Sequence, residues 1–151
     1  MNEREPDCTV RAMRQIDGRI AIVVRNLTLH AEGQMSLDSK ASTPGAVDYL
    51  MSALAADLLG GIGREASRAG VAVEDAEMSL AGRLDNPLVA LGVEGETGSP
   101  ALCSVTGTLY VSADADAETL ASLWSRALAR APVYSTLSRC ASLRIELKLV
   151  P

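Results

Sequence analysis

The sequence is poor in the residues that most often carry redox chemistry or bind metals. Its 151 residues include no phenylalanine, one tryptophan, one histidine and three cysteines. The number of cysteines is odd, and none of them forms a CxxC motif, so the sequence does not predict a disulfide framework. They stand at Cys8, Cys103 and Cys140. With His30 as the lone histidine, we expect no metal site and no cofactor. Three reduced thiols fit a cytoplasmic protein.

Positive charge is also scarce. Fourteen lysines and arginines stand against nineteen acidic residues, which gives a net charge of −5. Excess negative charge disfavours binding to nucleic acid and to anionic membranes, so we expect neither as a partner. The charged residues 1–11 contain no apolar core of a secretory signal. The composition therefore predicts a soluble, cytoplasmic protein.

One long apolar segment, residues 43–70, dominates the chain. Thr43 is a suitable N-cap, Pro44 suits the first helical position, and Gly70 suits the residue after the last turn. Apolar residues on other sides of the same helix predict that it is buried almost all round. The helical spacing is carried by Val47, Met51, Leu54, Leu58 and Ile62.

Two features complicate this helix. The first is a stripe of small residues, which suggests that another backbone packs closely: Ser52, Ala56, Gly60 and Gly63. The second is Asp57, a carboxylate in the most apolar part of the helix. Asp48 and Asp57 also argue against a membrane span, since each would cost about 2.5–3.5 kcal/mol at membrane depth.

The rest of the chain is read from its periodicity and its turn residues. Asp17-Gly18 predicts a hairpin, Asp116 predicts the cap of a second helix, and residues 132–139 suggest a third, short helix. Met35 and Leu37 leave room for a short strand in the polar loop before the long helix. Alternating or β-branched runs predict strands at 8–15, 19–25, 27–31, 71–84, 101–112 and 143–149, with a bulge in the fourth.

This order of elements predicts an α+β fold with a mostly antiparallel sheet, in one domain spanning residues 1–151. Two local stretches, together with that order, resemble the OsmC/Ohr family of osmotically inducible and organic hydroperoxide resistance proteins. The segment TPGAVDYLMSALAADLL, residues 43–59, is similar to the family's proline, Leu/Ala run and cysteine. Ala131-Pro132-Val133 is similar to its Cys-Pro-Val stretch.

The resemblance implies an OsmC-like fold with a long buried central helix in an intertwined homodimer. Two such helices would pack at the centre of the dimer, which gives the stripe of small residues a reason. The alternative is that the stripe packs against a sheet of the same chain.

The same resemblance implies thiol-based reduction of peroxides, in which a thiolate becomes a sulfenic acid and a second cysteine resolves it. The chain departs from this pattern at both positions. Asp57 stands at the peroxidatic position when the family's Ala-Leu-x-x-Cys register is applied, or Ala55 when the count starts at Pro44. Ala131 stands at the resolving position. Because a carboxylate has no two-electron donor atom, we expect the standard peroxidase activity to be absent.

Two classes of function follow. The first is binding of a small, largely apolar ligand in a pocket at the dimer interface, with Asp57, Arg64 and Ala131 as candidate pocket residues. The second is an enzyme of the organic hydroperoxide stress response: a thiol-dependent hydroperoxide reductase using Cys103 or Cys140, or an acid–base catalyst using Asp57. The missing pair of cysteines favours the first.

Three roles are open for Asp57 from the sequence alone. It could bind a ligand or act as a general base, pair with an arginine, or face water. Buried ionisable groups are enriched at functional sites, but structural ion pairs also produce them. For His30, a satisfied or exposed side chain is favoured over a catalytic one.

Overall fold

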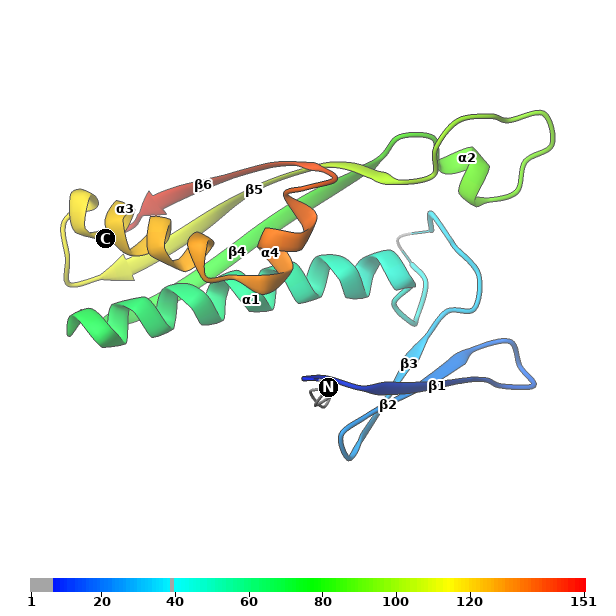
Figure 1. The fold of residues 1–151 in the computed structure, drawn as a ribbon, viewed down its shortest axis with the longest axis horizontal. Coiled ribbons are helices and arrows are strands. Elements are labelled where there is room, and N and C mark those ends of the chain that lie inside the picture. The colour runs from blue at the N-terminus through cyan, green and yellow to red at the C-terminus, as the bar shows by residue number, and fades with distance from the viewer. Residues whose placement is uncertain (1–6, 39) are drawn as a thin grey trace, which may run out of the picture. The chain divides into compact units, whose positions relative to one another are not determined.

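Three short strands near the amino terminus form an antiparallel sheet in the computed structural model, which describes residues 7–38 and 40–151 (Figure 1). Strand β1 spans Val10–Arg14, β2 spans Ile20–Val24 and β3 spans Leu27–Ala31, in the order β1-β2-β3. Gly18, at a φ of 90°, closes the first turn by donating its backbone N–H to Gln15 O at 3.0 Å. The hairpin predicted at Asp17-Gly18 is therefore confirmed.

This sheet belongs to the first of two compact units, which ends at Tyr49. The Tyr49 hydroxyl donates to the His30 backbone oxygen at 2.6 Å and so ties the end of the unit to β3. Residues 32–38 form no strand, so the short strand allowed at Met35 and Leu37 is wrong for the residues described there. A single domain over residues 1–151 stays a prediction.

The long helix α1 spans Ala46–Ala69 and begins later than predicted. Pro44 lies outside it, and its carbonyl accepts a hydrogen bond from the Glu32 N–H. The Asp48 carboxylate accepts one from the Gly45 N–H at 2.8 Å, which is half of a capping box. The predicted N-cap at Thr43 and first helical position at Pro44 are therefore wrong by two residues, because the Asp48 side chain inside the helix accepts the Gly45 amide.

The other end of α1 matches the prediction. Gly70 has a φ of +70° and donates to Ser67 O at 3.2 Å, while the Val71 N–H donates to Ala66 O at 2.9 Å. These two bonds form a Schellman motif, which glycine favours because it adopts a positive φ without strain.

Within the chain α1 is buried on one face, whereas the sequence predicted burial almost all round. The buried residues are Leu54, Leu58, Gly61, Ile62, Glu65 and Ala66. Ser52, Ala56 and Gly63 of the small-residue stripe are exposed, and among the described residues no atom outside the helix's own neighbouring backbone lies within 4 Å of a Cβ built on Gly63. Within the second unit, the stripe therefore does not pack against the sheet at Gly63.

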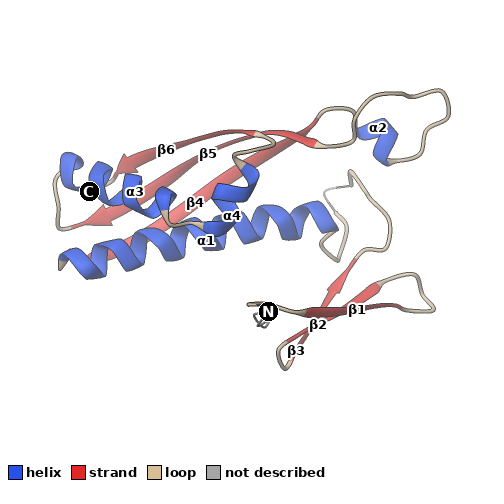
Figure 2. Cartoon of the chain, in the orientation of Figure 1, coloured by secondary structure: helices blue, strands red, loops and turns tan. Residues whose placement is uncertain are grey.

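The second unit, from Leu50 to Pro151, contains a three-stranded sheet in the order β4-β5-β6 (Figure 2). Strand β4 spans Val73–Leu84, β5 spans Leu102–Ala113 and β6 spans Ser142–Leu149. The β4–β5 pair is antiparallel, with a register shift between Val73 and Asp75 that confirms the predicted bulge. The β5–β6 pair is parallel, which needs a long crossover connection.

Helices provide that crossover. Helix α3 spans Ala117–Ala129, and the Asp116 carboxylate caps it by accepting the Thr119 N–H at 2.7 Å, as predicted. Helix α4 spans Pro132–Leu137. A further one-turn helix, α2 at Pro87–Ala90, was not predicted, because four residues are too few to show a helical period.

The core of the second unit lies between the sheet and helices α1 and α3, which cover the same face (Figures 1 and 2). Every side chain of its centre is fully buried, which makes this layer the main source of hydrophobic stabilisation. The centre consists of Leu54, Leu58, Val105, Leu109, Val111, Leu120 and Leu123.

By length and composition alone, α1 could also cross a membrane. Its buried face instead packs in the core of the second unit, as the core helix of a soluble protein does. The cytoplasmic location stays a prediction.

Candidate functional site at the start of helix α4

The candidate site is built where α1 meets the first turn of α4. Oδ2 of Asp57 accepts hydrogen bonds from the backbone N–H groups of Val133, at 2.8 Å, and Tyr134, at 3.1 Å. The N-cap residue of α4 is Ala131, whose side chain cannot accept a hydrogen bond, and Pro132 fills the first helical position. A carboxylate 76 residues away therefore caps this helix.

The geometry follows from the needs of a helix amino terminus. The first amides of a helix have no partner inside it, and the macrodipole makes this end attractive to an anion. Ala131 is 1% exposed, so water has little access at the cap position. The partly buried Asp57 carboxylate supplies the acceptor and the negative charge that Ala131 lacks.

This contact is a fourth role for Asp57, outside the three considered from the sequence. Within the part of the chain that the structure describes, its hydrogen bonds are made through Oδ2. Among the described residues no donor bonds Oδ1, which can therefore accept a hydrogen bond from a further group. Whether Asp57 also binds a ligand or acts in catalysis is a prediction that this geometry does not test.

The structure brings two of the three predicted pocket residues together. Asp57 contacts the turn that Ala131 begins, so one of the two candidate peroxidatic positions, Asp57 rather than Ala55, is the neighbour of the resolving position. Arg64 is exposed, and its guanidinium extends over Gly60, where a Cβ would lie 3.1 Å from Nη1. Among the described residues, Arg64 and Asp57 form no ion pair.

The two thiols considered as relocated nucleophiles lie elsewhere. Sγ of Cys103 donates to the Arg83 backbone oxygen at 3.2 Å, and Sγ of Cys140 donates to Leu137 O at 3.4 Å. Both are free cysteines, and each sulfur lies against a backbone carbonyl outside the contact between Asp57 and α4.

Sequence reasoning missed a second polar cluster, around Glu65. Its side chain is only 4% exposed and is contacted by three arginines: Arg68 at 2.8 Å, Arg130 at 2.7 Å and Arg126 at 3.3 Å. Hydrogen bonding by Arg130 is the main influence that lowers the pKa of Glu65 from its ordinary value. Two features of the sequence could have predicted this cluster. Glu65 follows Ile62 by three residues and so lies on the apolar face of α1, and Arg126 and Arg130 are four residues apart, which places them on one side of a helix.

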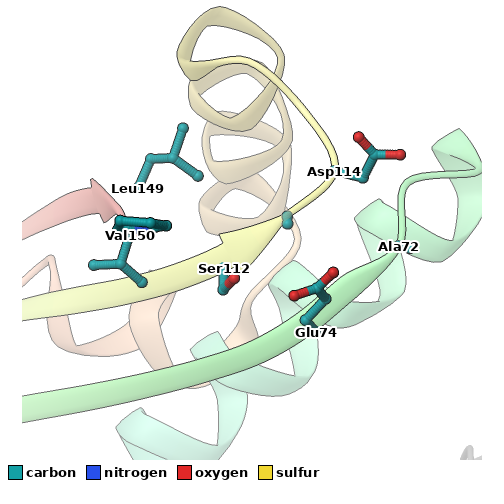
Figure 3. Close-up of a pocket in the computed structure, with 8 residues that line it drawn as sticks. Ala72, Glu74, Ser112, Asp114, Leu149 and Val150 are labelled. Carbon is teal, nitrogen blue, oxygen red and sulfur yellow. The ribbon is translucent and has the colours of Figure 1, made fainter.

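Among the hollows of the second unit, two bear on ligand binding. One lies at the ends of the three strands, with the carboxylates of Glu74 and Asp114 on one side and Leu149 and Val150 on the other (Figure 3). The other is apolar, lies between α3 and β6 beside Trp124, and measures about 200 Å³. That is below the ~300–1,000 Å³ typical of ligand pockets. Among the described residues, no group of three His, Cys, Asp or Glu side chains could hold a metal ion.

Comparison with known proteins bears on the fold. No protein-family model matches the sequence, and no curated protein matches it. An OsmC-like protein from Mycoplasma pneumoniae superposes with a TM-score of 0.81 at 15% identity, covering 98% of this chain and 100% of that one. An OsmC organic hydroperoxide resistance protein from Legionella pneumophila gives 0.70 at 13% identity, covering 97% and 99%. OhrB of Bacillus subtilis gives 0.62 at 16% identity, covering 93% and 97%.

The chain therefore has the α+β fold shared by the OsmC-like and Ohr proteins, over nearly its whole length. This confirms, at the level of the fold, the resemblance drawn from the sequence. The long central helix and the mostly antiparallel sheets are part of that fold.

Proposed function

We propose that this chain is a non-peroxidatic protein of the OsmC/Ohr fold that binds a small, largely apolar ligand in a pocket completed by a second copy of itself. The observation that carries the proposal is the pairing of Asp57 with the start of α4. The position where a peroxidatic sulfur is expected holds a carboxylate committed to two backbone amides.

This pairing argues against peroxide reduction at the site. Reduction of an O–O bond needs two electrons from the attacking atom, which a thiolate sulfur supplies by becoming a sulfenic acid. The oxygens of Asp57 offer no such oxidation, and Ala131 offers no second sulfur. The site retains the Oδ1 atom of Asp57, which can accept a hydrogen bond from a ligand, beside the first turn of α4.

The surroundings favour a mostly apolar ligand with one hydrogen-bond donor. Leu50, two helical turns before Asp57 on the same side of α1, is 37% exposed. Val133 and Tyr134 are partly buried beside the carboxylate. An apolar body would cover Leu50 and Val133, and a hydroxyl or N–H group would satisfy Oδ1 of Asp57.

The need for a second copy rests on the face of α1 that the second unit leaves uncovered. Ser52, Ala56 and Gly63 lie exposed there, and small side chains let two helices approach closely. The apolar cavity beside Trp124 is too small to serve alone. A homodimer that packs two α1 helices together would cover this face and enclose the pocket.

Several fold neighbours are named for organic hydroperoxide resistance. Carried over to this chain, a role in the response to hydroperoxide stress would mean binding an organic product or signal rather than destroying the peroxide.

The purified protein is expected to show no turnover of an organic hydroperoxide with a dithiol reductant. Consumption of tert-butyl or cumene hydroperoxide by the protein should equal that by the Cys103→Ser/Cys140→Ser double variant. Turnover that either single substitution abolishes would contradict the proposal and establish the relocated-thiol enzyme.

Substitution Ala56→Arg is expected to convert the dimer to a monomer, because a long cation would occupy the space between two α1 helices. Light scattering coupled to size exclusion measures the mass directly. Ser125→Arg on α3, also at an exposed small residue, should leave the mass unchanged. A monomeric wild-type protein would refute the homodimer.

Ligand binding is expected to depend on the dimer. The neutral dye Nile red should bind the wild-type protein saturably, at one site per chain, with fluorescence enhancement lost in Ala56→Arg. Equal enhancement in wild type and variant would refute a pocket completed by the second copy.

A further inference from the structure

The arginines around Glu65 form a cationic cluster on the outside of a chain whose net charge is −5. Arg68 comes from the last turn of α1, Arg126 from the last turn of α3, and Arg130 is the C-cap residue of α3. Both oxygens of Glu65 are occupied, since Oε1 accepts from Arg68 and Arg130 and Oε2 accepts from Arg126. Three positive charges therefore meet one negative charge.

The cluster holds more charge than the buried carboxylate needs. One guanidinium neutralises one carboxylate, and each further guanidinium in contact adds repulsion between like charges. Among the described residues, Glu65 is the one carboxylate within ion-pair distance of these three arginines. The cluster is left with two positive charges in excess, and a bound dianion would neutralise them.

The guanidinium groups are also placed to receive such an ion. Their side chains are 61%, 46% and 58% exposed for Arg68, Arg126 and Arg130. Each carries five N–H donors. Hydrogen bonds among the described residues use one donor on Arg68, one on Arg130 and two on Arg126, of which the second goes to Ser122 Oγ. Most of the donors therefore face solvent.

Glu65 fixes these long side chains in advance. Ordering an arginine side chain from solution costs rotamer entropy. Here that cost is met on folding by contacts to a buried acceptor, so less is lost when a ligand binds. The planar fork of arginine matches the oxygens of a phosphate group in two-point contacts.

We propose that Arg68, Arg126 and Arg130 form a binding site for a phosphate-type dianion, the phosphate monoester or pyrophosphate group of a small molecule. Glu65 acts in this site as the positioning residue. The site involves residues other than those at the start of α4 and does not depend on the function proposed above.

The test is a titration of the full-length protein with pyrophosphate at constant ionic strength, followed by the NMR resonances of the arginine Nε–H groups. The Arg68, Arg126 and Arg130 resonances should shift together and saturate. In Arg126→Gln the dissociation constant should rise about 10-fold, the loss expected from one charge-assisted hydrogen bond. Arg126 is chosen because its 3.3 Å contact to Glu65 is the longest of the three, so its loss disturbs the cluster least.

Arg139→Gln is the matched control, because Arg139 is an exposed arginine outside the cluster. It should leave the dissociation constant within twofold of wild type. Shifts that never saturate, or an equal loss of affinity in Arg139→Gln and Arg126→Gln, would overturn the proposal in favour of general charge attraction. The circular dichroism spectrum of each variant verifies that it is folded, and Arg126→Lys serves as the second variant if Arg126→Gln is not.

Discussion

Replacement of Asp57 by alanine is expected to lower the free energy of unfolding by about 1–2 kcal/mol, the usual cost of removing a helix cap. The Val133 and Tyr134 amides would lose their acceptor at a position shielded by the buried Ala131. Urea denaturation measures the change, and amide hydrogen exchange locates it. Protection should fall at Val133 and Tyr134 more than in the core of α1.

Two further variants test whether the lost stability comes from the cap. Asp57→Asn keeps a neutral acceptor and should lose less stability than Asp57→Ala, because asparagine also caps helices well. Asp85→Ala removes an exposed carboxylate for which no side-chain bond is described, and should change stability little. If Asp57→Ala and Asp85→Ala cost the same, the cap contributes nothing and Asp57 would have to be explained by binding alone.

Much of the fold was predictable because its signals are local. The Asp17-Gly18 hairpin, the Asp116 cap, the Gly70 terminus and the bulge near Val73 each depend on a few adjacent residues. Their chemistry is the same in any context. Strand periodicity added the order of elements, and that order carried the resemblance to the OsmC/Ohr fold.

The errors arose where a local signal had competition. Pro44 is a good first helical residue, but the Asp48 carboxylate bonded the Gly45 amide and set the start of α1 after it. Apolar residues around α1 predicted burial on every side, yet the second unit covers one face of the helix only. An apolar helix face indicates that the face should be buried, but it does not indicate whether the same chain or a second chain buries it.

The candidate site could be located but not interpreted from the sequence. Asp57 stood out as a carboxylate among leucines and alanines, and Ala131 stood out before Pro132. Their contact joins residues more than 70 positions apart and uses backbone amides, which carry no sequence signature. The cluster around Glu65 was not predicted for a different reason. Its three partners are long arginine side chains, and the sequence does not show whether such side chains contact a glutamate or extend into water.

Substitution Glu65→Gln is expected to make the protein less stable at neutral pH and to flatten the fall of its stability in acid. The pKa of Glu65 is lowered from its ordinary value of 4.5, chiefly by hydrogen bonding to Arg130. A lowered pKa in the folded state means that the carboxylate stabilises the fold fully above the unfolded pKa. That stabilisation is lost as the pH falls through the folded pKa.

Urea midpoints of wild type and Glu65→Gln should therefore differ most at neutral pH and converge in acid, below pH 4.5. Asp17 and Asp116 also have lowered pKa values, from a side-chain bond to Arg19 and a backbone bond from Thr119. They titrate equally in both proteins, so the difference between the two curves isolates Glu65. Parallel curves for Glu65→Gln would mean that the three arginines do not stabilise the charged form of Glu65 in the fold.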